Sequence, residues 1–518
     1  MRMHVMKVVR FRALISTVCL LLFVITSQGN ASGTGDQLKD IEKLFGKDWY
    51  GLYMMGQKLG YAATDLGRTE FHGEKGYKLN IQTHCEIAMF GVKANLDNDE
   101  TRIYGADGKL RRLEFTMSQP MGAPVRFTGE VDSGKFRLAK KIADQEQVVL
   151  VEIPNETLRD ALEEAAMIHE NTKVGDSHES EVYQPLLDEK QTLHARSVVT
   201  AVEQTMYNGV PTRVFRVETT IVPLGITTVA KVSAGGETLE ENFGGLTMRL
   251  EDEALAKDIK YAVDMVVSSA ILTRRRIENP HTVTEMTARI GGIADENLII
   301  NDARQSYSAV QTAAEEQESR ASSQETTVQS PKSWLLTVRK DNLDGVQPAS
   351  VPMKPEEFGS ALRPSVLVQS ADTKIVQLAR SIVGDEKNAF ETTKKLNEWV
   401  YRNLKKDFTA SLSNALDTLK QKSGDCTEHS VLLVALARAV GLPAREVAGV
   451  VYSDEGGGFF FHQWAEVYVG TWIATDPTFG QPIADATHIK LTEGDILKQM
   501  RIIGAIGRLK IEVVDYKK

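Results

Sequence analysis

Hydrophobic and polar residues alternate with a period of two through much of the first half of the chain, from Trp49 onward. Runs such as YKLNIQTHCEIAMF and LRRLEFTMSQ are typical of strands with one buried face, and turn sequences such as GADGK separate them. The pair Asn208-Gly209 is a further hairpin signal between two such runs. The pattern predicts consecutive antiparallel strands and therefore a mostly antiparallel β domain.

One segment of this half departs from the alternation. Between Asn155 and Glu170, apolar residues recur at helical spacing, which predicts an amphipathic helix. A curved antiparallel sheet wrapped over one or two helices would bury the apolar faces of both kinds of element.

The last third of the chain shows helical periodicity first and strand periodicity afterwards. Asp372 is expected to cap one helix, and a longer helix is expected from about Asn388 to Lys405. A further helix is expected from about Cys426 to Val440, and its apolar residues cover most of its circumference, which is typical of a central, buried helix. Helices followed by an antiparallel sheet predict an α+β fold for this part. Strands are expected at Arg445 to Tyr452, Phe459 to Val469 and Trp472 to Asp476.

Composition changes sharply at residues 303–333, where Gln, Ser, Glu, Thr and Ala replace large apolar residues. This bias predicts a disordered insertion. The chain is therefore expected to have four parts. They are a signal peptide at 1–31, a β-rich N-terminal domain at 32–265, a β connector that carries the insertion at 266–350, and an α+β domain at 351–518.

The first 31 residues have the layout of a secretory signal peptide. Basic residues precede an apolar stretch from Ala13 to Thr26, and Gly29-Asn30-Ala31 offers a small-residue cleavage site. We expect the protein to be secreted or periplasmic after cleavage, and an uncleaved membrane anchor is the alternative. No other stretch of the sequence is long and apolar enough to predict a membrane span.

The charge balance is acidic, because 61 Lys and Arg stand against 70 Asp and Glu, for a formal net charge of −9. Such a chain is a poor electrostatic partner for nucleic acid, so nucleic-acid binding is not expected. The sequence carries no indication of oligomeric state.

The chain has three cysteines, of which Cys19 lies in the predicted signal peptide. Cys85 lies in an alternating run and is expected to be a buried structural thiol. Cys426 remains as the candidate nucleophile. A disulfide between Cys85 and Cys426 would inactivate that thiol.

Cys426 lies where a thiol can become reactive. Asp425 occupies the expected N-cap and Glu428 completes a capping box, so Cys426 falls in the first helical turn. Backbone N–H groups and the helix dipole favour a thiolate there, whereas the two carboxylates oppose a second anion. A cation must therefore lie against the sulfur, and a histidinium is the usual one. A packed, unreactive cysteine is the alternative.

Two later strands supply the missing partners. A period of two places His462 and Trp464 on one face of the strand that begins at Phe459, and Asp476 ends the next strand. A helix start that faces this hairpin would bring the Cys426 nucleophile, the His462 base and the orienting Asp476 together as a catalytic triad. Trp464 is expected either to form a wall of the site or to be a core aromatic.

A metal site is an alternative, because Cys426 and His429 share a helix face. Zinc requires two more ligands at suitable spacing, and no CxxC or HxxxH supplies them. No metal and no cofactor are therefore expected, and His429 is expected to be a packed or hydrogen-bonded core histidine. Glu466, on the strand face of His462, is expected to form a structural ion pair.

The segments GDCTEHSVLLVALARAVGLPAR, FHQWAEVYV and WIATDPTFG together resemble the transglutaminase-like superfamily, in particular its secreted bacterial members. The resemblance covers roughly residues 355–518. It implies a papain-like, transglutaminase-like core with Cys426 as nucleophile, His462 as base and Asp476 as its orienting partner. Members of the superfamily include protein cross-linkers, proteases, amidases and inactive relatives, so the resemblance alone does not define the reaction.

The expected activity is that of a secreted thiol enzyme acting on amide bonds of a protein or peptide substrate. The Cys426 thiolate would attack the amide carbonyl and form a thioester, which water or an amine then resolves. We favour hydrolysis, since water is always available and no lysine-binding feature is recognisable. The alternatives are a cross-linking transglutaminase and a catalytically inactive binding or scaffold protein of the same fold.

Overall fold

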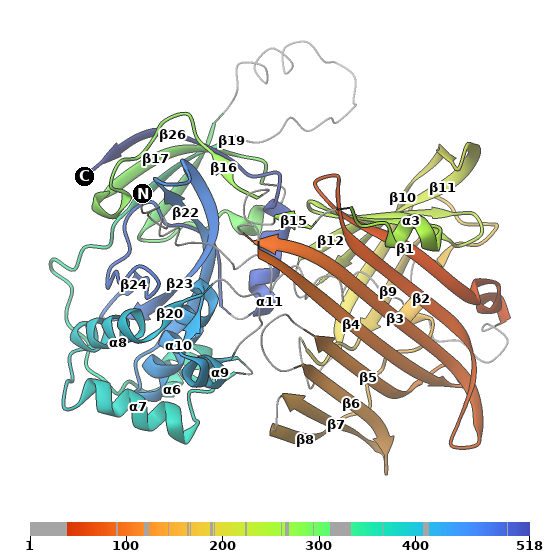
Figure 1. Ribbon diagram of the computed structural model, residues 1–518, viewed down its shortest axis with the longest axis horizontal. Coiled ribbons are helices and arrows are strands. Elements are labelled where there is room, and N and C mark those ends of the chain that lie inside the picture. Colours follow the sequence, from red (N-terminus) through yellow and green to blue (C-terminus); the bar gives the residue numbers. More distant parts are fainter. Residues whose placement is uncertain are drawn as a thin grey trace, which may run out of the picture. The chain divides into compact units, whose positions relative to one another are not determined.

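The computed structural model of the protein describes residues 39–310 and 333–518, apart from gaps at 90–91, 119–123, 143–144, 163–164, 166, 187–189, 191, 223–224, 261, 265–268, 294, 366, 408–413 and 495. The signal peptide predicted at 1–31 lies outside the described residues. The chain divides after Ser268 into an N-terminal unit built mainly from strands and a C-terminal unit of helices and strands (Figure 1).

The N-terminal unit consists of one large sheet. Its strands follow the order β8-β7-β6-β5-β4-β3-β2-β1-β14-β13-β12-β11-β10-β9, and neighbours in this order run antiparallel. A short strand, β15 (Val263–Asp264), adds a parallel pairing with β3. This topology confirms the predicted antiparallel β domain. The strands are β1 (Gly46–Met54), β2 (Gln57–Phe71), β3 (Glu74–Met89), β4 (Val92–Gly105), β5 (Leu110–Ser118), β6 (Val125–Asp132), β7 (Lys135–Ile142), β8 (Gln145–Val151), β9 (Ser177–Val182), β10 (Leu193–Tyr207), β11 (Val210–Ile221), β12 (Ile226–Ser233), β13 (Thr238–Phe243) and β14 (Leu246–Glu251).

Alternating burial along the strands gives the sheet its two faces. In β12, every second residue from Ile226 to Val232 is buried. The hairpin of β10 and β11 turns through Asn208 and Gly209, which both have positive φ, at 48° and 77°. A two-residue turn of this kind favours Asn followed by Gly, so the hairpin confirms the signal in the sequence.

The helix predicted from Asn155 is wrong at its start, because helical structure begins only at the 3-10 helix η2 (Asp160–Leu162). The backbone hydrogen bonds of this segment account for the difference. The Leu158 N–H donates to the Gly108 carbonyl at 2.7 Å, and Lys109 and Thr157 form an antiparallel bridge. The buried Glu156 carboxylate adds hydrogen bonds from the Tyr104 hydroxyl at 2.6 Å and from the backbone N–H of Tyr183 at 2.8 Å.

The C-terminal unit is built from a group of helices that packs against an antiparallel sheet. The sheet has the order β16-β23-β22-β25, and β24 pairs with the part of β23 that follows Ala465. Helices α7, α8 and α9 pack around the central helix α10, which also contacts β22 and β23 (Figure 1). This arrangement confirms the predicted α+β fold. The elements are α7 (Thr373–Val383), α8 (Ala389–Asn403), α9 (Ala415–Gln421), α10 (Cys426–Ala439), β16 (Ile271–Leu272), β22 (Ala444–Ser453), β23 (Gly458–Tyr468), β24 (Trp472–Thr475) and β25 (Ile489–Glu493).

Helix α10 begins and ends as the sequence predicts. The Asp425 carboxylate accepts from the N–H of Thr427 at 2.7 Å, and the Glu428 carboxylate accepts from the N–H of Asp425 at 2.8 Å, so the capping box is formed. Every residue from Cys426 to Ala437 is buried. A helix buried on all sides fixes the position of its first residue firmly within the unit.

A second sheet in the same unit has the order β18-β19-β17-β26. Its edge strand β18 (Gln305–Val310) falls within the predicted disordered insertion, so that prediction is wrong for these residues. Gln305 is buried and donates to the carbonyl oxygens of Ile300 at 2.9 Å and Lys490 at 2.8 Å. Distant backbone therefore satisfies a polar residue that composition alone associates with disorder. Residues 311–332 lie outside the described residues.

Residues 269–350, which make up the predicted connector (266–350) apart from its first three residues, lie within the C-terminal unit. Its strands β17 (Glu285–Gly291) and β19 (Ser333–Arg339) pair with each other, and β17 also pairs with the last strand, β26 (Lys510–Lys517). Smaller described elements complete the chain: η1 (Lys39–Leu44), α3 (Glu253–Lys257), η3 (Pro280–Thr282), η4 (Glu296–Leu298), α6 (Pro355–Phe358), η5 (Gly359–Leu362), β20 (Lys405–Lys406), β21 (Ser423–Gly424), α11 (Ile496–Gln499) and η6 (Met500–Ala505).

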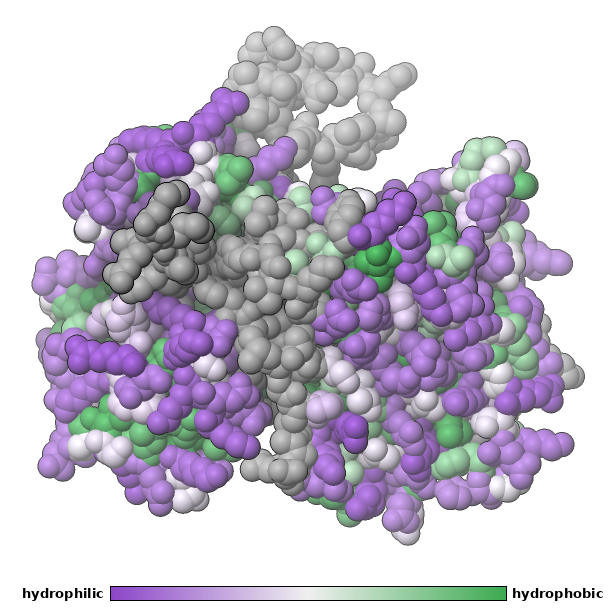
Figure 2. All heavy atoms as spheres, viewed as in Figure 1, coloured by the Kyte–Doolittle hydropathy of each residue, from purple (hydrophilic) through white to green (hydrophobic). Residues whose placement is uncertain are grey.

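Hydrophilic residues cover most of the described surface on the face shown in Figure 2, and apolar residues form small, separate groups there. Among the described residues, no helix combines the length and the hydropathy that crossing a membrane would require.

Candidate active site

Cys426 is the first residue of α10, with 1% of its surface exposed. The preceding turn depends on Gly424, because a Cβ there would lie 2.3 Å from the Cβ of Glu428. The glycine thus lets the capping box close immediately before the cysteine. Cys426 therefore lies at a helix N-terminus, as the sequence predicts, where the helix dipole favours a negative charge on the sulfur.

Helix α10 is joined to the strand that carries His462. The Ser430 hydroxyl, one helical turn after Cys426, donates to the carbonyl oxygen of Gln463 at 3.1 Å. Gln463 is the residue that follows His462 in β23. The start of α10 therefore lies against the His462 part of this strand.

The His462 imidazole is fully buried and contacts two aromatic rings. Phe479 stacks on it with 4.9 Å between ring centroids and 11° between the ring planes, and Trp464 lies on it at 6.1 Å and 25°. These contacts restrict rotation of the imidazole, so its two nitrogens have defined directions.

Asp476 follows directly after β24 and is also fully buried. Its Oδ2 accepts from His462 Nε2 at 2.8 Å, and its Oδ1 accepts from the N–H groups of Thr478 at 2.7 Å and Phe479 at 3.1 Å. Burial alone would favour the neutral acid. The charge of His462 and the hydrogen bonds from His462 and His488 outweigh burial and hold the pKa of Asp476 well below its usual range.

The hydrogen bond to Asp476 determines the role of each His462 nitrogen. A carboxylate can only accept, so His462 Nε2 carries the proton in this contact. Nδ1 is then the nitrogen that can exchange a proton with a thiol. The structure brings His462 and Asp476 into the contact expected of a triad, and it ties the helix that begins at Cys426 to the same strand.

A second histidine on Asp476, His488, was not predicted from the sequence. Its Nε2 lies 3.0 Å from Asp476 Oδ2, and its Nδ1 lies 3.3 Å from Oδ1 of Asp485. His488 immediately precedes β25, and no spacing pattern relates it to the other residues. Only the return of β25 to the edge of β22 brings it to the site.

The ligand atoms of His462, Asp476 and His488 all lie within 4.8 Å of one another, a separation at which three residues could hold a metal ion. In the structure these atoms bond to one another, since both Nε2 atoms share Asp476 Oδ2. Hydrogen bonding therefore accounts for the cluster. The expectation of no metal and no cofactor stays a prediction.

His429, the other candidate ligand, is a hydrogen-bonded core histidine, as predicted. It is fully buried, and its Nδ1 donates to the backbone carbonyl of Asp425 at 2.6 Å. Burial lowers the pKa of His429, so the ring is favoured in its neutral form.

Glu466 forms the structural ion pairs that the sequence predicts. Its carboxylate lies 2.7 Å from Lys490 Nζ and 2.6 Å from Arg445 Nη2. Lys490, which is 2% exposed, also contacts Glu493 at 2.8 Å. A carboxylate held by two cations in this way is poorly suited to act as a base.

Trp464 is 1% exposed and packs with Val447, Ala474 and Ala484 in a small core cluster. It is therefore a core aromatic that supports His462 from within the sheet. Its role as a wall of a substrate site stays a prediction.

Cys85, in β3 of the N-terminal unit, is 1% exposed. Burial, followed by the charge of Asp97, raises the pKa of its thiol to about 12. The burial and the raised pKa of Cys85 agree with the prediction that it is a buried structural thiol.

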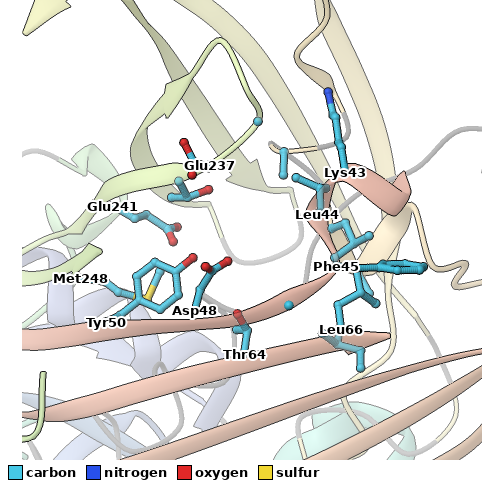
Figure 3. Close-up of a pocket in the computed structure, with 17 residues that line it drawn as sticks. Lys43, Leu44, Phe45, Asp48, Tyr50, Thr64, Leu66, Glu237, Glu241 and Met248 are labelled. Atoms are coloured by element: carbon cyan, nitrogen blue, oxygen red, sulfur yellow. The ribbon is translucent and has the colours of Figure 1, made fainter. Parts of the chain in front are cut away.

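A cavity of about 260 Å³ in the N-terminal unit contains none of the predicted site residues. The carboxylates of Asp48, Glu237 and Glu241 and the Tyr50 hydroxyl converge on one side of it, and the Lys43 side chain points away from them (Figure 3). Burial and then the charge of Glu237 raise the pKa of Asp48.

A capped helix that begins with cysteine, packed on an antiparallel sheet that supplies histidine and then aspartate, defines a transglutaminase-like core. The family model of the transglutaminase-like superfamily matches residues 376–477, a segment that includes Cys426, His462 and Asp476. This part of the chain is transglutaminase-like, which confirms the resemblance seen in the sequence.

Two solved structures show weaker likeness. A proposed cysteine protease from Cytophaga hutchinsonii is 19% identical, with 45% of this chain and 86% of that chain covered and a TM-score of 0.28. A β-barrel-like protein of unknown function from Brucella abortus is 15% identical, with 40% and 94% covered and a TM-score of 0.29. No curated protein matches the chain. Likenesses of this size carry no conclusion about chemistry.

Proposed function

We propose that the protein is a thiol hydrolase of amide bonds in proteins or peptides, with Cys426, His462 and Asp476 as its catalytic triad. The observation that supports this most strongly is the buried 2.8 Å hydrogen bond between His462 Nε2 and Asp476 Oδ2, on a strand tied to the helix that Cys426 begins. A buried carboxylate of this kind stabilises a protonated imidazole at neutral pH. The protonated imidazole in turn stabilises a reactive thiolate.

The reaction begins when His462 Nδ1 takes the proton of the Cys426 thiol. The thiolate attacks the amide carbonyl carbon, and the backbone N–H of Cys426 donates to the oxyanion that forms. His462 then gives its proton to the leaving amine as the C–N bond breaks, which leaves a thioester on the sulfur.

Water completes the cycle. His462 takes a proton from the water that attacks the thioester, and the carboxylic acid leaves as the thiolate reforms. Asp476 remains ionised throughout and stabilises the imidazolium. An amine in place of water would give the transfer reaction of a cross-linking enzyme.

The signal-peptide layout supports a further part of the proposal, namely that the enzyme acts after export, in the periplasm or outside the cell. N-terminal sequencing of the exported protein tests this part. A mature chain beginning near Ser32 is expected, and a chain that retains Met1 would contradict it.

Incubation with a defined peptide mixture in ¹⁸O-labelled water tests the proposed reaction. Hydrolysis introduces ¹⁸O into new carboxyl groups, whereas transfer to an added primary amine gives new amides without the label. Cys426→Ala is the control, because it removes the nucleophile and keeps a small residue at the helix start. Equal products from wild type and Cys426→Ala would overturn the proposal.

A further inference from the structure

His488 is a buried histidine for which the proposed mechanism provides no step. It is fully buried, like Asp476, and its ring lies 5.9 Å from the ring of His462. Its two nitrogens point to two different carboxylates. Nε2 contacts Asp476 Oδ2 at 3.0 Å, and Nδ1 contacts Asp485 Oδ1 at 3.3 Å and the Asp485 carbonyl oxygen at 3.2 Å.

The partners of these nitrogens show how many protons the ring carries. Carboxylate and carbonyl oxygens accept hydrogen bonds and have no proton to give. A neutral imidazole has one N–H, so it could satisfy one of the two sides but not both. His488 satisfies both sides only as an imidazolium with a proton on each nitrogen.

Asp485 is built to hold its place in this contact. Its Oδ1 accepts from the Thr487 hydroxyl at 2.6 Å and the Thr487 N–H at 2.9 Å, and its Oδ2 accepts from Gln481 Nε2 at 2.8 Å. The side-chain Oε1 of Gln481 in turn accepts from the Asp485 N–H at 2.8 Å. The acceptor for His488 Nδ1 is therefore held from several directions.

We propose that His488 is a positioning residue of the active site, a doubly protonated imidazolium that holds the Asp476 carboxylate against His462 and sets the pH range in which Cys426 is reactive. This inference rests on the proposed function. His488 acts through Asp476 and takes no part in the proton transfers themselves.

The charges of the cluster show the direction of the effect. Asp476 and Asp485 carry two negative charges and His488 one positive charge, so the cluster has a net charge of −1. A net charge of −1 balances the single positive charge of a protonated His462. Without the charge of His488 the net charge would be −2, which would stabilise protonated His462 and protonated Cys426 too strongly for reaction near neutral pH.

Two further charged groups lie against Asp485 and its neighbour Ala484, namely the half-exposed His281 and Arg304, which is paired with Asp341. His281 Nδ1 lies 3.4 Å from Asp485 Oδ2, and the Arg304 guanidinium donates to the Ala484 carbonyl at 3.0 Å and pairs with Asp341 at 3.1 Å. Despite burial, the carboxylates of Asp485 and Asp476 raise the pKa of His488. The shift agrees with the hydrogen-bond partners.

The test is the pH dependence of Cys426 alkylation by iodoacetamide in His488→Gln. Loss of a nearby positive charge makes Cys426 and His462 harder to deprotonate. The acid limb and the alkaline limb of the rate profile should therefore both move to higher pH by about one unit. His281→Gln is the matched control, since His281 lies 3.4 Å from Asp485 Oδ2 and its side chain is 48% exposed, where solvent screens its charge. The pH profile of Cys426 alkylation in His281→Gln should match that of the wild type.

A folded His488→Gln variant whose limbs do not move would overturn the inference and assign His488 a purely structural role. Nitrogen-15 NMR of the wild-type histidines provides an independent measurement if that variant does not fold. Two ring protons on His488 at pH 7 are expected, and a single one would overturn the inference. If wild-type Cys426 titrates as an ordinary thiol, the proposed function fails, and the NMR result for His488 still stands.

Discussion

His462 Nε2 lies 2.8 Å from Asp476 Oδ2, and neither side chain has any surface exposed to solvent. The contact joins β23 to the residue that follows β24, two strands that pair antiparallel, so the sheet itself determines the separation of the two side chains. An aspartate placed in this way orients the ring and supports a positive charge on it.

Replacement of His462 should affect the thiol far more than replacement of His429. In His462→Ala the base and the counter-cation are lost, so the alkylation rate of Cys426 at pH 7 should fall by about 10-fold or more. His429→Ala removes a core hydrogen bond and should lower the free energy of unfolding by about 1–3 kcal/mol. Mass spectrometry of the labelled peptide and chemical denaturation measure the two effects.

If Cys426 were alkylated more slowly in His429→Ala than in His462→Ala, with both variants equally folded, the sulfur would be paired with His429 instead.

Asp476→Asn should impair the enzyme less than His462→Ala. The asparagine side chain can still accept a hydrogen bond from the imidazole, but it cannot stabilise a positive charge on it. The alkaline limb of the Cys426 alkylation profile should therefore move to lower pH. A profile identical to that of the wild type would show that Asp476 does not act on His462.

The stability of the protein should depend on His488 in a way that changes with pH. The pKa of His488 is raised in the folded state above its ordinary value of 6.5. A group with a raised folded pKa contributes its full stabilisation below its unfolded pKa and loses it as pH rises through the folded value. The difference in melting temperature between wild type and His488→Gln should therefore be larger at pH 6 than at pH 9, as calorimetry can measure. A difference that grows toward alkaline pH would contradict the assignment.

Glu466 should be important for stability and unimportant for thiol chemistry. Glu466→Ala removes one of three carboxylates within 2.8 Å of Lys490 Nζ and leaves Asp302 and Glu493 in place, so the free energy of unfolding should fall by about 1–3 kcal/mol. The alkylation profile of Cys426 should be unchanged in folded protein. A shifted profile with unchanged stability would indicate a direct role for Glu466 in the site.

Local signals in the sequence were sufficient to place Cys426 at the start of a capped helix. The capping box of Asp425 and Glu428 is a contact between neighbours in the chain, so residue identity alone determined where α10 begins. The period of β23 likewise placed His462 and Trp464 on one face. These parts of the site depend on interactions within single elements.

The remaining parts depend on contacts between elements. His488 reaches Asp476 only through the pairing of β25 with β22, and nothing near it in the sequence indicates that contact. The backbone of Lys490 satisfies the Gln305 side chain, and the segment that follows Asn155 is non-helical because its backbone bonds to residues 108–110. Composition and periodicity contain no information on such distant partners.

The alkylation of Cys426 and Cys85 in the same wild-type molecule tests the central claim most directly. Both thiols are 1% exposed, so a difference in rate reflects the pKa of each thiol rather than its accessibility to the reagent. We expect Cys426 to react with iodoacetamide at pH 6, at a substantial fraction of its maximal rate, because His462 and Asp476 stabilise its thiolate. Cys85 should react only at strongly alkaline pH, since burial raises its pKa to about 12. Equal profiles for the two cysteines would show that Cys426 is an ordinary buried thiol and would contradict the assignment of the triad.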